Sequence, residues 1–192
     1  MVGVRVIRPE YVELLRQHRA DNNPEWGGSA VRNAGDHIVR WLNRRKDIVS
    51  VLDFGCGVGT LKPYVKRLTA RLDLEWHEYD PSVPGKDVEP TRTFDAIITT
   101  DVLEHIELCS LDETLRWIRE HATRAQFHHI DCNDNKSLLP DGRSVHLIVE
   151  PMEWWLDELE IPGWTLMYYA NIMQRKRSRE RHSGTIVLDR CA

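Results

Sequence analysis

Apolar side chains near the N-terminus recur at the three-to-four-residue spacing of amphipathic helices. Residues 9–20 place Leu15 within one apolar face, and residues 34–46 place Trp41 and Leu42 together. Charged side chains fill the opposite faces. The pattern predicts two helices that each pack against a core by one face.

After residue 48 the pattern changes to short apolar runs that alternate with amphipathic segments. Runs of this length are typical of buried strands, and the segments between them are typical of helices. The expected strands are residues 51–54, 72–79, 94–100, 125–131, 164–171 and 185–189, and the expected helices are residues 61–70, 111–124 and 152–160. This alternation predicts an α/β fold with a doubly wound, mostly parallel sheet of about seven strands and an antiparallel C-terminal hairpin.

The whole chain, residues 1–192, is expected to form a single domain. Residues 1–47 would supply N-terminal helices and a lid, and residues 48–192 would form the α/β core. The lid would be the turn-rich residues 21–30, which surround Trp26. A plain connector with Trp26 packed into the core is an equal alternative.

Composition and charge exclude several classes of protein. The net charge of −4 argues against a protein that coats duplex nucleic acid, although a local basic patch could still bind a few phosphates. No apolar run approaches the roughly 20 residues of a membrane span, and the N-terminus lacks the apolar centre of a secretion signal. A cytoplasmic protein is therefore expected. The four cysteines form no C-x-x-C pair, so neither a zinc site nor a disulfide framework is indicated.

Between the expected strand 51–54 and helix 61–70 lies a glycine-rich turn with the sequence Gly-Cys-Gly-Val-Gly. Gly55, Gly57 and Gly59 leave the backbone open to a ligand and permit positive φ, and the following helix start offers unpaired N–H groups. The dinucleotide fingerprint G-x-G-x-x-G requires glycine at position 60, where this chain has threonine. The spacing therefore argues against a nicotinamide dinucleotide.

With "LDFGCGVG" and "FDAIITTDVLEHI" the chain resembles the class I S-adenosylmethionine-dependent methyltransferases, particularly their small-molecule branch. The resemblance implies a Rossmann-like fold with S-adenosylmethionine as cofactor. It also implies a third strand and its helix after residue 80, but residues 82–93 contain two prolines and a glycine and are too short for both. Stand-alone phage and bacterial methyltransferases look similar in "LPDGRSVHLIVEPMEWW".

The resemblance assigns cofactor-binding roles to residues that follow the first four strands of the family. Asp53 would lie near the amino group of the methionine part, Asp80 would accept hydrogen bonds from both ribose hydroxyls, and Asp87 would contact the adenine amino group. The full predicted set is Asp53, Gly55, Cys56, Gly57, Gly59, Asp80, Asp87 and Asp101. A simple Asp-Pro-Ser turn is the alternative role for Asp80.

Methyl transfer requires a positioned nucleophile and, where necessary, a base that removes its proton. Side chains just past the carboxyl ends of the strands are the candidates: Asp101, Glu104, His105 and His146. The two histidines are favoured as the base because of the ordinary pKa of imidazole. His105 could instead only hold its loop, and His146 could be a strand-entry residue. His128 and His129 would point to opposite faces of a strand, so at most one could reach the site.

The cluster Asp101-x-x-Glu104-His105 is similar to one that holds magnesium or manganese in ubiquinone-pathway O-methyltransferases and in small-RNA 2′-O-methyltransferases of the Hen type. Oxygen ligands with one imidazole suit such an ion. The same letters occur in many members without metal, so both possibilities stay open.

The expected activity is transfer of a methyl group to oxygen or nitrogen of a small polar acceptor, such as a metabolite, saccharide or nucleotide. Trp26, Glu104 and Trp154 are the predicted substrate contacts. Two alternatives stay open: a nucleic-acid methyltransferase of the ribose 2′-O type that uses the basic residues 175–181, and a partner subunit that binds the cofactor without chemistry. The motifs of exocyclic-amine and carbon-5 base methylation are missing, which disfavours those reactions.

Overall fold

A six-stranded sheet forms the centre of the computed structural model, which describes residues 7–22, 28, 31–69, 71, 73–176 and 179–191. The strand order is β2-β1-β3-β4-β6-β5. The strands are β1 (Ser50–Phe54), β2 (Glu75–Tyr79), β3 (Phe94–Thr100), β4 (Ala122–Asp131), β5 (Trp164–Lys176) and β6 (Arg179–Arg190). The first four are parallel, and β6 pairs antiparallel with both β4 and β5. The predicted mostly parallel α/β fold with an antiparallel C-terminal hairpin is confirmed.

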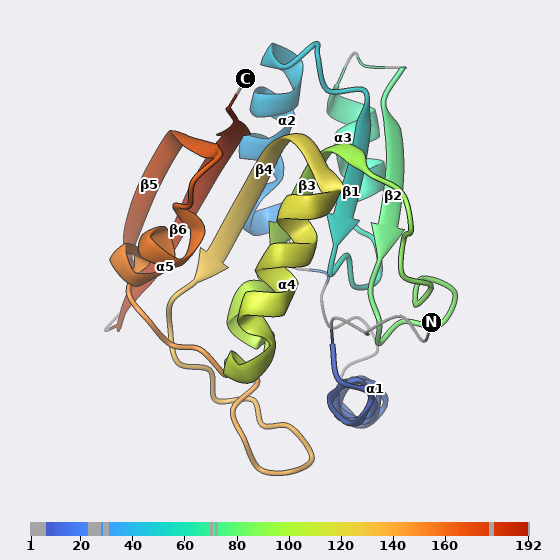
Figure 1. The fold of residues 1–192 in the computed structure, drawn as a ribbon. Helices are drawn as coiled ribbons and strands as arrows, with labels where there is room; N and C mark the ends of the chain where they lie inside the picture. Colours follow the sequence, from blue (N-terminus) through green and yellow to red (C-terminus); the bar gives the residue numbers. More distant parts are fainter. Residues whose placement is uncertain are drawn as a thin grey trace.

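Helices cover both faces of this sheet (Figure 1). They are α1 (Pro9–Asn22), α2 (Asp36–Arg44), α3 (Leu61–Leu68), α4 (Leu108–His121) and α5 (Met152–Leu159), with a π-helical turn η1 (Val31–Gly35) before α2 and a 3-10 turn η2 (Leu103–His105) before α4. One core lies beneath α1, α4 and α5 and includes Leu15, Leu115 and Trp155. A second core lies beneath α2 and α3 and includes Ile38 and Leu61. Each helix buries the apolar face that its sequence spacing indicates.

The sheet differs from the prediction in its number of strands. Among the described residues it has six strands rather than about seven, and the segment after β2 forms turns, as the two prolines and the glycine of residues 82–93 indicated. Pro84 and Pro90 cannot donate to a strand ladder, and Gly85 has a φ of +84°. β2 is therefore the edge of the sheet on this side.

Several element boundaries also differ from the prediction, and the largest differences are at the α4–β4 boundary and in the C-terminal strands. The structure ends α4 at His121 and starts β4 at Ala122, because Ala122 pairs with Phe94 of β3. The C-terminal strands are longer than expected and pair from Trp164 with Arg190 to Lys176 with Arg179. Most of the arginine-rich segment therefore continues the hairpin strands.

The carboxyl ends of β1, β2 and β3 meet at one edge of the sheet, and α1 lies beyond that edge (Figure 1). The functional candidates from sequence are concentrated there. No helix in the described part of the chain has the length and apolar character needed to cross a membrane.

The face beneath α4 contains one buried polar network, centred on His128 of β4. The ring is fully buried and lies 2.8 Å from the Thr99 hydroxyl and 3.1 Å from the Gln126 side-chain oxygen. A neutral ring satisfies both contacts, with Nδ1 accepting and Nε2 donating. Burial lowers the pKa of His128 from 6.5 to about 3, and the positive charge of Arg119 contributes to this lowering.

We expect this network to make the fold sensitive to mild acid. The unfolded chain takes up a proton at His128 near pH 6.5, whereas the folded chain does so only near pH 3, so stability is lost as the pH falls through this window. Between pH 6.5 and 5 the loss from this group is about 2 kcal/mol. Urea unfolding at pH 6.5 and pH 5 measures this loss of unfolding free energy. We expect the loss in His128→Gln to be smaller than in the wild type by about 2 kcal/mol. An unchanged pH dependence in the variant would contradict the assignment.

Candidate active site

The glycine-rich loop, residues 55–59, leaves β1 with its backbone held against the end of β2. The amides of Gly55 and Cys56 donate to the Tyr79 carbonyl at 2.8 and 3.1 Å. Gly55, Gly57 and Gly59 all have positive φ, of 76°, 54° and 83°. These glycines are therefore required by the turn itself.

Gly55→Ala is expected to destabilise the fold more than Gly85→Ala. Both residues have positive φ, so each change carries a backbone cost of about 1–2 kcal/mol. A Cβ at Gly55 would also lie 2.5 Å from a Val102 methyl carbon, whereas a Cβ at Gly85 would meet nothing within 4 Å. The clash should add about 1–3 kcal/mol, measurable by urea unfolding. Equal losses in the two variants would show that the loop can move away from Val102.

Asp80, just after β2, accepts three hydrogen bonds beside this loop. Its Oδ2 accepts from the Gly57 amide at 2.9 Å, and its Oδ1 accepts from the amide and hydroxyl of Ser82 at 2.9 and 2.7 Å. The carboxylate thus ties the glycine-rich loop to the turn after β2. It also lines a cavity between the loop and α1, where a ligand with hydroxyl groups could reach it.

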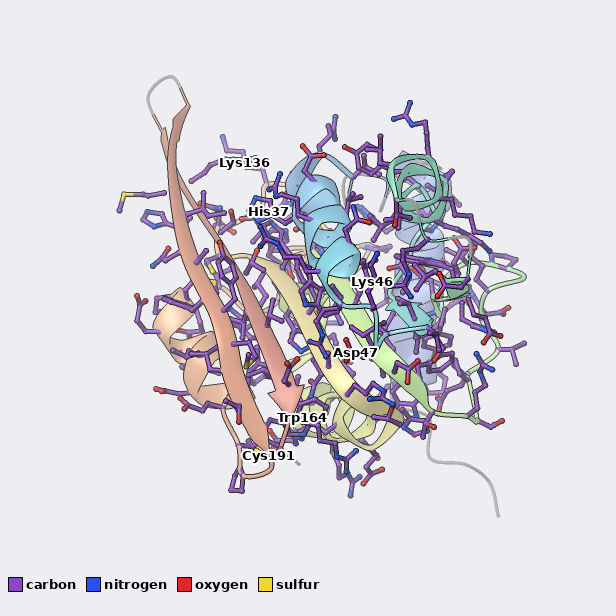
Figure 2. The ribbon with its side chains drawn as sticks, turned by 90° about the horizontal axis from the view of Figure 1, so that it is seen from above. His37, Lys46, Asp47, Lys136, Trp164 and Cys191 are labelled. Carbon is purple, nitrogen blue, oxygen red and sulfur yellow. The ribbon has the colours of Figure 1, made fainter. Side chains whose placement is uncertain are left out.

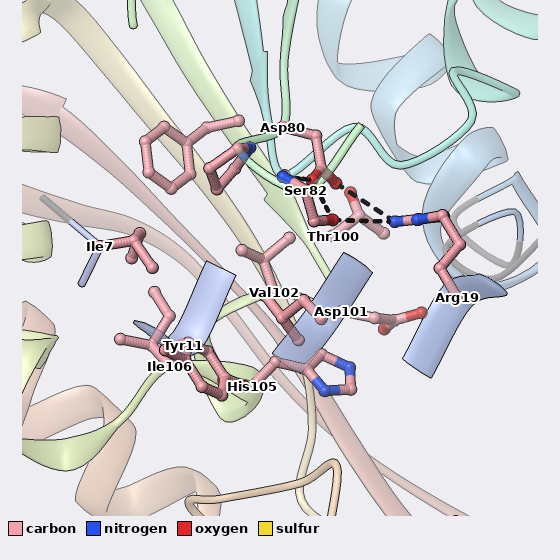
Figure 3. Close-up of a pocket in the computed structure, with 14 residues that line it drawn as sticks. Ile7, Tyr11, Arg19, Asp80, Ser82, Thr100, Asp101, Val102, His105 and Ile106 are labelled. Atoms are coloured by element: carbon pink, nitrogen blue, oxygen red, sulfur yellow. Dashed lines mark hydrogen bonds and ion pairs between the residues drawn. The ribbon is translucent and has the colours of Figure 1, made fainter. Parts of the chain in front are cut away.

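Helix α1 forms the outer wall of this cavity, which sequence analysis did not predict. Tyr11, Leu15 and Arg19 line it, and Arg19 donates to the Ser82 hydroxyl at 3.2 Å and lies 3.8 Å from Asp80 (Figure 3). The signal was present in the sequence, because positions 11, 15 and 19 share one helix face and a cation on the buried face of an amphipathic helix is unusual.

Asp101 follows β3 on the opposite wall of the cavity. It is the only described residue other than glycine with positive φ, at 54°, a strained conformation that is concentrated at functional sites. Its Oδ2 accepts from the Asn33 side chain at 2.5 Å, and its Oδ1 lies 3.8 Å from Nε2 of His129. Nδ1 of His129 in turn lies 3.0 Å from the Thr185 hydroxyl. His129 is therefore the member of the His128–His129 pair that reaches the site.

Next to Asp101, the chain brings together Glu104, His105 and His146, with ligand atoms that all lie within 4.8 Å of one another. Nδ1 of His105 donates to the Val145 carbonyl at 2.6 Å, and Nδ1 of His146 donates to the Asn133 carbonyl at 2.5 Å. With Nδ1 donating, an uncharged ring carries its lone pair on Nε2, and Nε2 of His146 lies 3.2 Å from the side-chain nitrogen of Asn135. The sequence predicted Asp101, Glu104 and His105 as the possible metal ligands. In the structure His146, and not Asp101, completes the group with Glu104 and His105.

The electrostatics of the cluster favour neutral groups. Burial, with a contribution from His146, lowers the pKa of His105 to about 4. Burial and the neighbouring Asp101 raise the pKa of Glu104 well above its usual range. One Glu104 oxygen accepts from the Asp131 amide at 3.0 Å, whereas Oε2 is buried with no hydrogen-bond partner among the described residues. A buried, unpaired carboxylate oxygen is costly unless it binds a proton donor or a cation.

The structure places His146 outside any strand. Residues 145–151 are irregular, and the Leu147 and Ile148 amides both donate to the Glu104 carbonyl, at 2.8 and 3.1 Å. These contacts fasten the segment beside η2. The alternative role of His146 as a strand-entry residue is therefore wrong.

Other predicted site residues lie around the cavity without lining it. Asp53 is buried at the end of β1, where burial, reinforced by Glu78, raises its pKa to about 8, and Cys56 is buried with a raised pKa. The Asp87 carboxylate accepts from Arg16 of α1 at 3.1 Å, and Trp154 packs edge-on against Trp155 at a ring-centroid distance of 4.9 Å. Their cofactor and substrate roles stay predictions.

Two further predictions concern segments that the structure does not describe in full. Trp26 lies outside the described residues, as do the side chains of most of residues 175–181. The lid role of Trp26 and the phosphate-binding role of the basic segment therefore stay predictions.

Together, the glycine-rich loop, the acidic residue after β2 and the polar cluster after β3 define a Rossmann-like protein with a cofactor cavity at the carboxyl ends of its parallel strands. The chain belongs to the family whose model is described as a methyltransferase domain, which matches residues 13–158. The predicted membership among class I S-adenosylmethionine-dependent methyltransferases is confirmed.

Two solved structures with a similar fold are methyltransferases of low sequence identity. The 1,6-didemethyltoxoflavin-N1-methyltransferase of Burkholderia thailandensis, with bound acceptor and S-adenosylhomocysteine, is 15% identical, with a TM-score of 0.66 over 100% of this chain and 94% of that chain. The magnesium protoporphyrin IX methyltransferase of Synechocystis PCC 6803, with S-adenosylhomocysteine, is 16% identical, with a TM-score of 0.60 over 95% of each chain. Among curated proteins, no sequence matches.

Proposed function

We propose that this protein transfers the methyl group of S-adenosylmethionine to an oxygen or nitrogen of a small polar acceptor, such as a metabolite, saccharide or nucleotide. The observation that carries the proposal is the convergence of Gly55, Asp80, Asp101 and His105 on one cavity, closed by α1. The acceptors named for the similar structures, a toxoflavin precursor and a porphyrin, are also small molecules.

The residues that would bind the methyl donor and those that would bind the acceptor follow different strands of the sheet. Asp80, after β2, would accept hydrogen bonds from the ribose hydroxyls, and the glycine-rich loop would hold the methionine part. The acceptor would lie beside Asp101 and His105, after β3. As the carbon–sulfur bond breaks and the new bond to the acceptor forms, the acceptor proton would pass to Nε2 of His105, which carries a lone pair in the neutral ring.

A divalent cation fits the Glu104–His105–His146 cluster, since one carboxylate oxygen is buried without a hydrogen-bond partner and both Nδ1 atoms donate to backbone carbonyls. Glu104, His105 and His146 would hold the ion, since their ligand atoms all lie within 4.8 Å of one another. Two imidazoles and one carboxylate favour manganese or another transition metal over magnesium. When bound, such an ion lowers the pKa of an acceptor hydroxyl.

Calorimetry with S-adenosylmethionine tests the donor half of the proposal, and micromolar binding is expected. A transfer screen with labelled cofactor, run on metabolite extract and on RNA, with and without chelator, tests the acceptor half. Transfer to RNA alone would favour the nucleic-acid alternative, and binding without any transfer would favour a non-catalytic subunit. Absence of cofactor binding would contradict all three.

A further inference from the structure

A second concave site lies on the far face of the sheet, between α2 and the C-terminal hairpin. On this side β6 and β5 have no helix over them in the part of the chain that the structure describes (Figure 2). The groove has a volume of about 450 Å³. It is lined by His37, Arg40, Trp41, Arg44 and Arg45 from α2 and its end, and by Phe127, Met167, Tyr168, Val187 and Asp189 from the sheet. None of these residues lines the cofactor cavity.

The α2 wall of this groove is cationic. His37, Arg40 and Arg44 recur three and four residues apart, so they share one helix face over about 10.5 Å. None of the three makes a hydrogen bond or ion pair with another described residue. Asp189, the acidic group in the groove, is bound by Arg45 at 2.5 Å. Arg40 and Arg44 therefore give the wall positive charge that no ion pair with another described residue neutralises.

The floor and the opposite wall are aromatic and apolar. Trp41 packs on Phe127, with ring centroids 5.3 Å apart, and forms the floor together with Val187. On β5, a bulge between Leu166 and Tyr168 breaks the regular pairing. Met167 is 58% exposed and Tyr168 is 46% exposed, which is unusual for large apolar side chains beside a groove.

We propose that this groove binds single-stranded nucleic acid. Phosphates would lie along Arg40 and Arg44, and bases would stack on Tyr168 and the exposed part of Trp41. Charge on one wall and flat rings on the other match a polymer that has phosphates on one edge and bases on the other. A duplex keeps its bases stacked internally and could not use the rings. The groove would bind RNA or DNA whether the methyl acceptor is a small molecule or a nucleic acid.

An acidic amphipathic peptide is the competing occupant, because it would also satisfy cations beside an apolar floor. It is disfavoured because the unpaired arginines are aligned on one helix and one of the two large exposed side chains opposite them, Tyr168, is an aromatic ring. Nucleic acid uses both features at once.

The test is fluorescence anisotropy of a labelled eight-nucleotide oligouridylate, titrated with the full-length protein between 50 and 200 mM salt. Two phosphate contacts predict a slope of log affinity against log salt of about −1.4. Arg40→Ala/Arg44→Ala should abolish that slope and weaken binding at least tenfold at 50 mM salt. Lys66→Ala/Arg67→Ala on α3 removes the same charge elsewhere and should change binding less than twofold.

The aromatic contribution is tested separately. Tyr168→Leu should weaken binding about tenfold, whereas Tyr168→Phe should retain it, because stacking needs the ring and not the hydroxyl. The proposal would be overturned if the α2 and α3 double variants lost affinity for the oligouridylate equally. It would also be overturned if the protein bound duplex as tightly as the single strand. A polyglutamate peptide or a mononucleotide that competes better than the octamer would contradict it as well. S-adenosylmethionine calorimetry on every variant should be unchanged, which separates this result from failure of the methyl-transfer proposal.

Discussion

Alanine at position 80 is expected to raise the dissociation constant for S-adenosylmethionine by at least about a hundredfold. The substitution would remove two charge-assisted hydrogen bonds from the carboxylate to the ribose, each worth about 1.5–3 kcal/mol. Every 1.4 kcal/mol changes the dissociation constant tenfold. It would also lose the contact to the Gly57 amide at 2.9 Å, which shapes the loop beneath the methionine part. Isothermal titration calorimetry measures the affinity directly.

Asp80→Asn and Asp157→Ala complete this experiment. Asparagine keeps the shape of the side chain and can still accept at one position, so its loss of affinity should be smaller than that of alanine. Asp157 is an exposed aspartate on α5, and its removal changes the net charge equally without touching the cavity. Near-native affinity in Asp80→Ala, with the fold intact by circular dichroism, would show that Asp80 only closes the turn after β2.

Local sequence patterns were sufficient to bring Gly55 and Asp80 to one cavity. A parallel strand, a glycine turn and an acidic residue at the end of the next strand are each defined by contiguous residues, and β1 pairs in register with β2 from Ser50 with Glu75 to Phe54 with Tyr79. Because both strands are parallel neighbours, their carboxyl ends meet without any further long-range information. Asp80 therefore lines the cavity as the sequence indicated.

The positions of the Glu104–His105–His146 cluster and of α1 depend on contacts that no local sequence pattern encodes. His146 lies beside His105 only because the irregular segment 145–151 folds back onto the Glu104 carbonyl. Helix α1 covers the cavity because Arg8 pairs with Glu107 and Tyr11 donates to the His105 carbonyl. These pairs join residues far apart in sequence, and a single sequence does not reveal such pairs.

The error at the α4–β4 boundary has a related cause. Ala122, Thr123 and Arg124 follow an amphipathic helix and include good helix formers, so a helix to residue 124 was expected. In the structure Ala122 is fully buried opposite Phe94, and the Thr123 hydroxyl donates to the Phe94 carbonyl at 3.0 Å. Pairing with β3 outweighs the local helix preference.

Removal of the His146 imidazole is expected to lower methyl transfer to the acceptor by about a hundredfold or more without changing cofactor affinity. His105 is the proposed base and His146 would be a ligand of the proposed ion, and loss of a metal ligand has an effect at least as large as the 10–100-fold typical of its supporting residues. His146 is absent from the cofactor cavity, so S-adenosylmethionine binding should be preserved. His121→Ala, at the end of α4 and outside the cluster, is the matched control.

Glu104→Gln distinguishes a metal centre from a simple base. Burial and the neighbouring Asp101 raise the pKa of Glu104, which favours the uncharged carboxyl when no cation is bound, and a glutamine of the same shape should keep the free energy of unfolding within about 1 kcal/mol. The amide is a far weaker cation ligand than a carboxylate. Manganese binding, followed by electron paramagnetic resonance, should therefore be lost in Glu104→Gln and His146→Ala and retained in His121→Ala. If neither wild type nor variants bind manganese while His146→Ala still loses transfer, the cluster acts through His105 and His146 alone. Full transfer activity in both Glu104→Gln and His146→Ala would exclude a catalytic metal at this cluster and leave His105 as its only member with a role in the reaction.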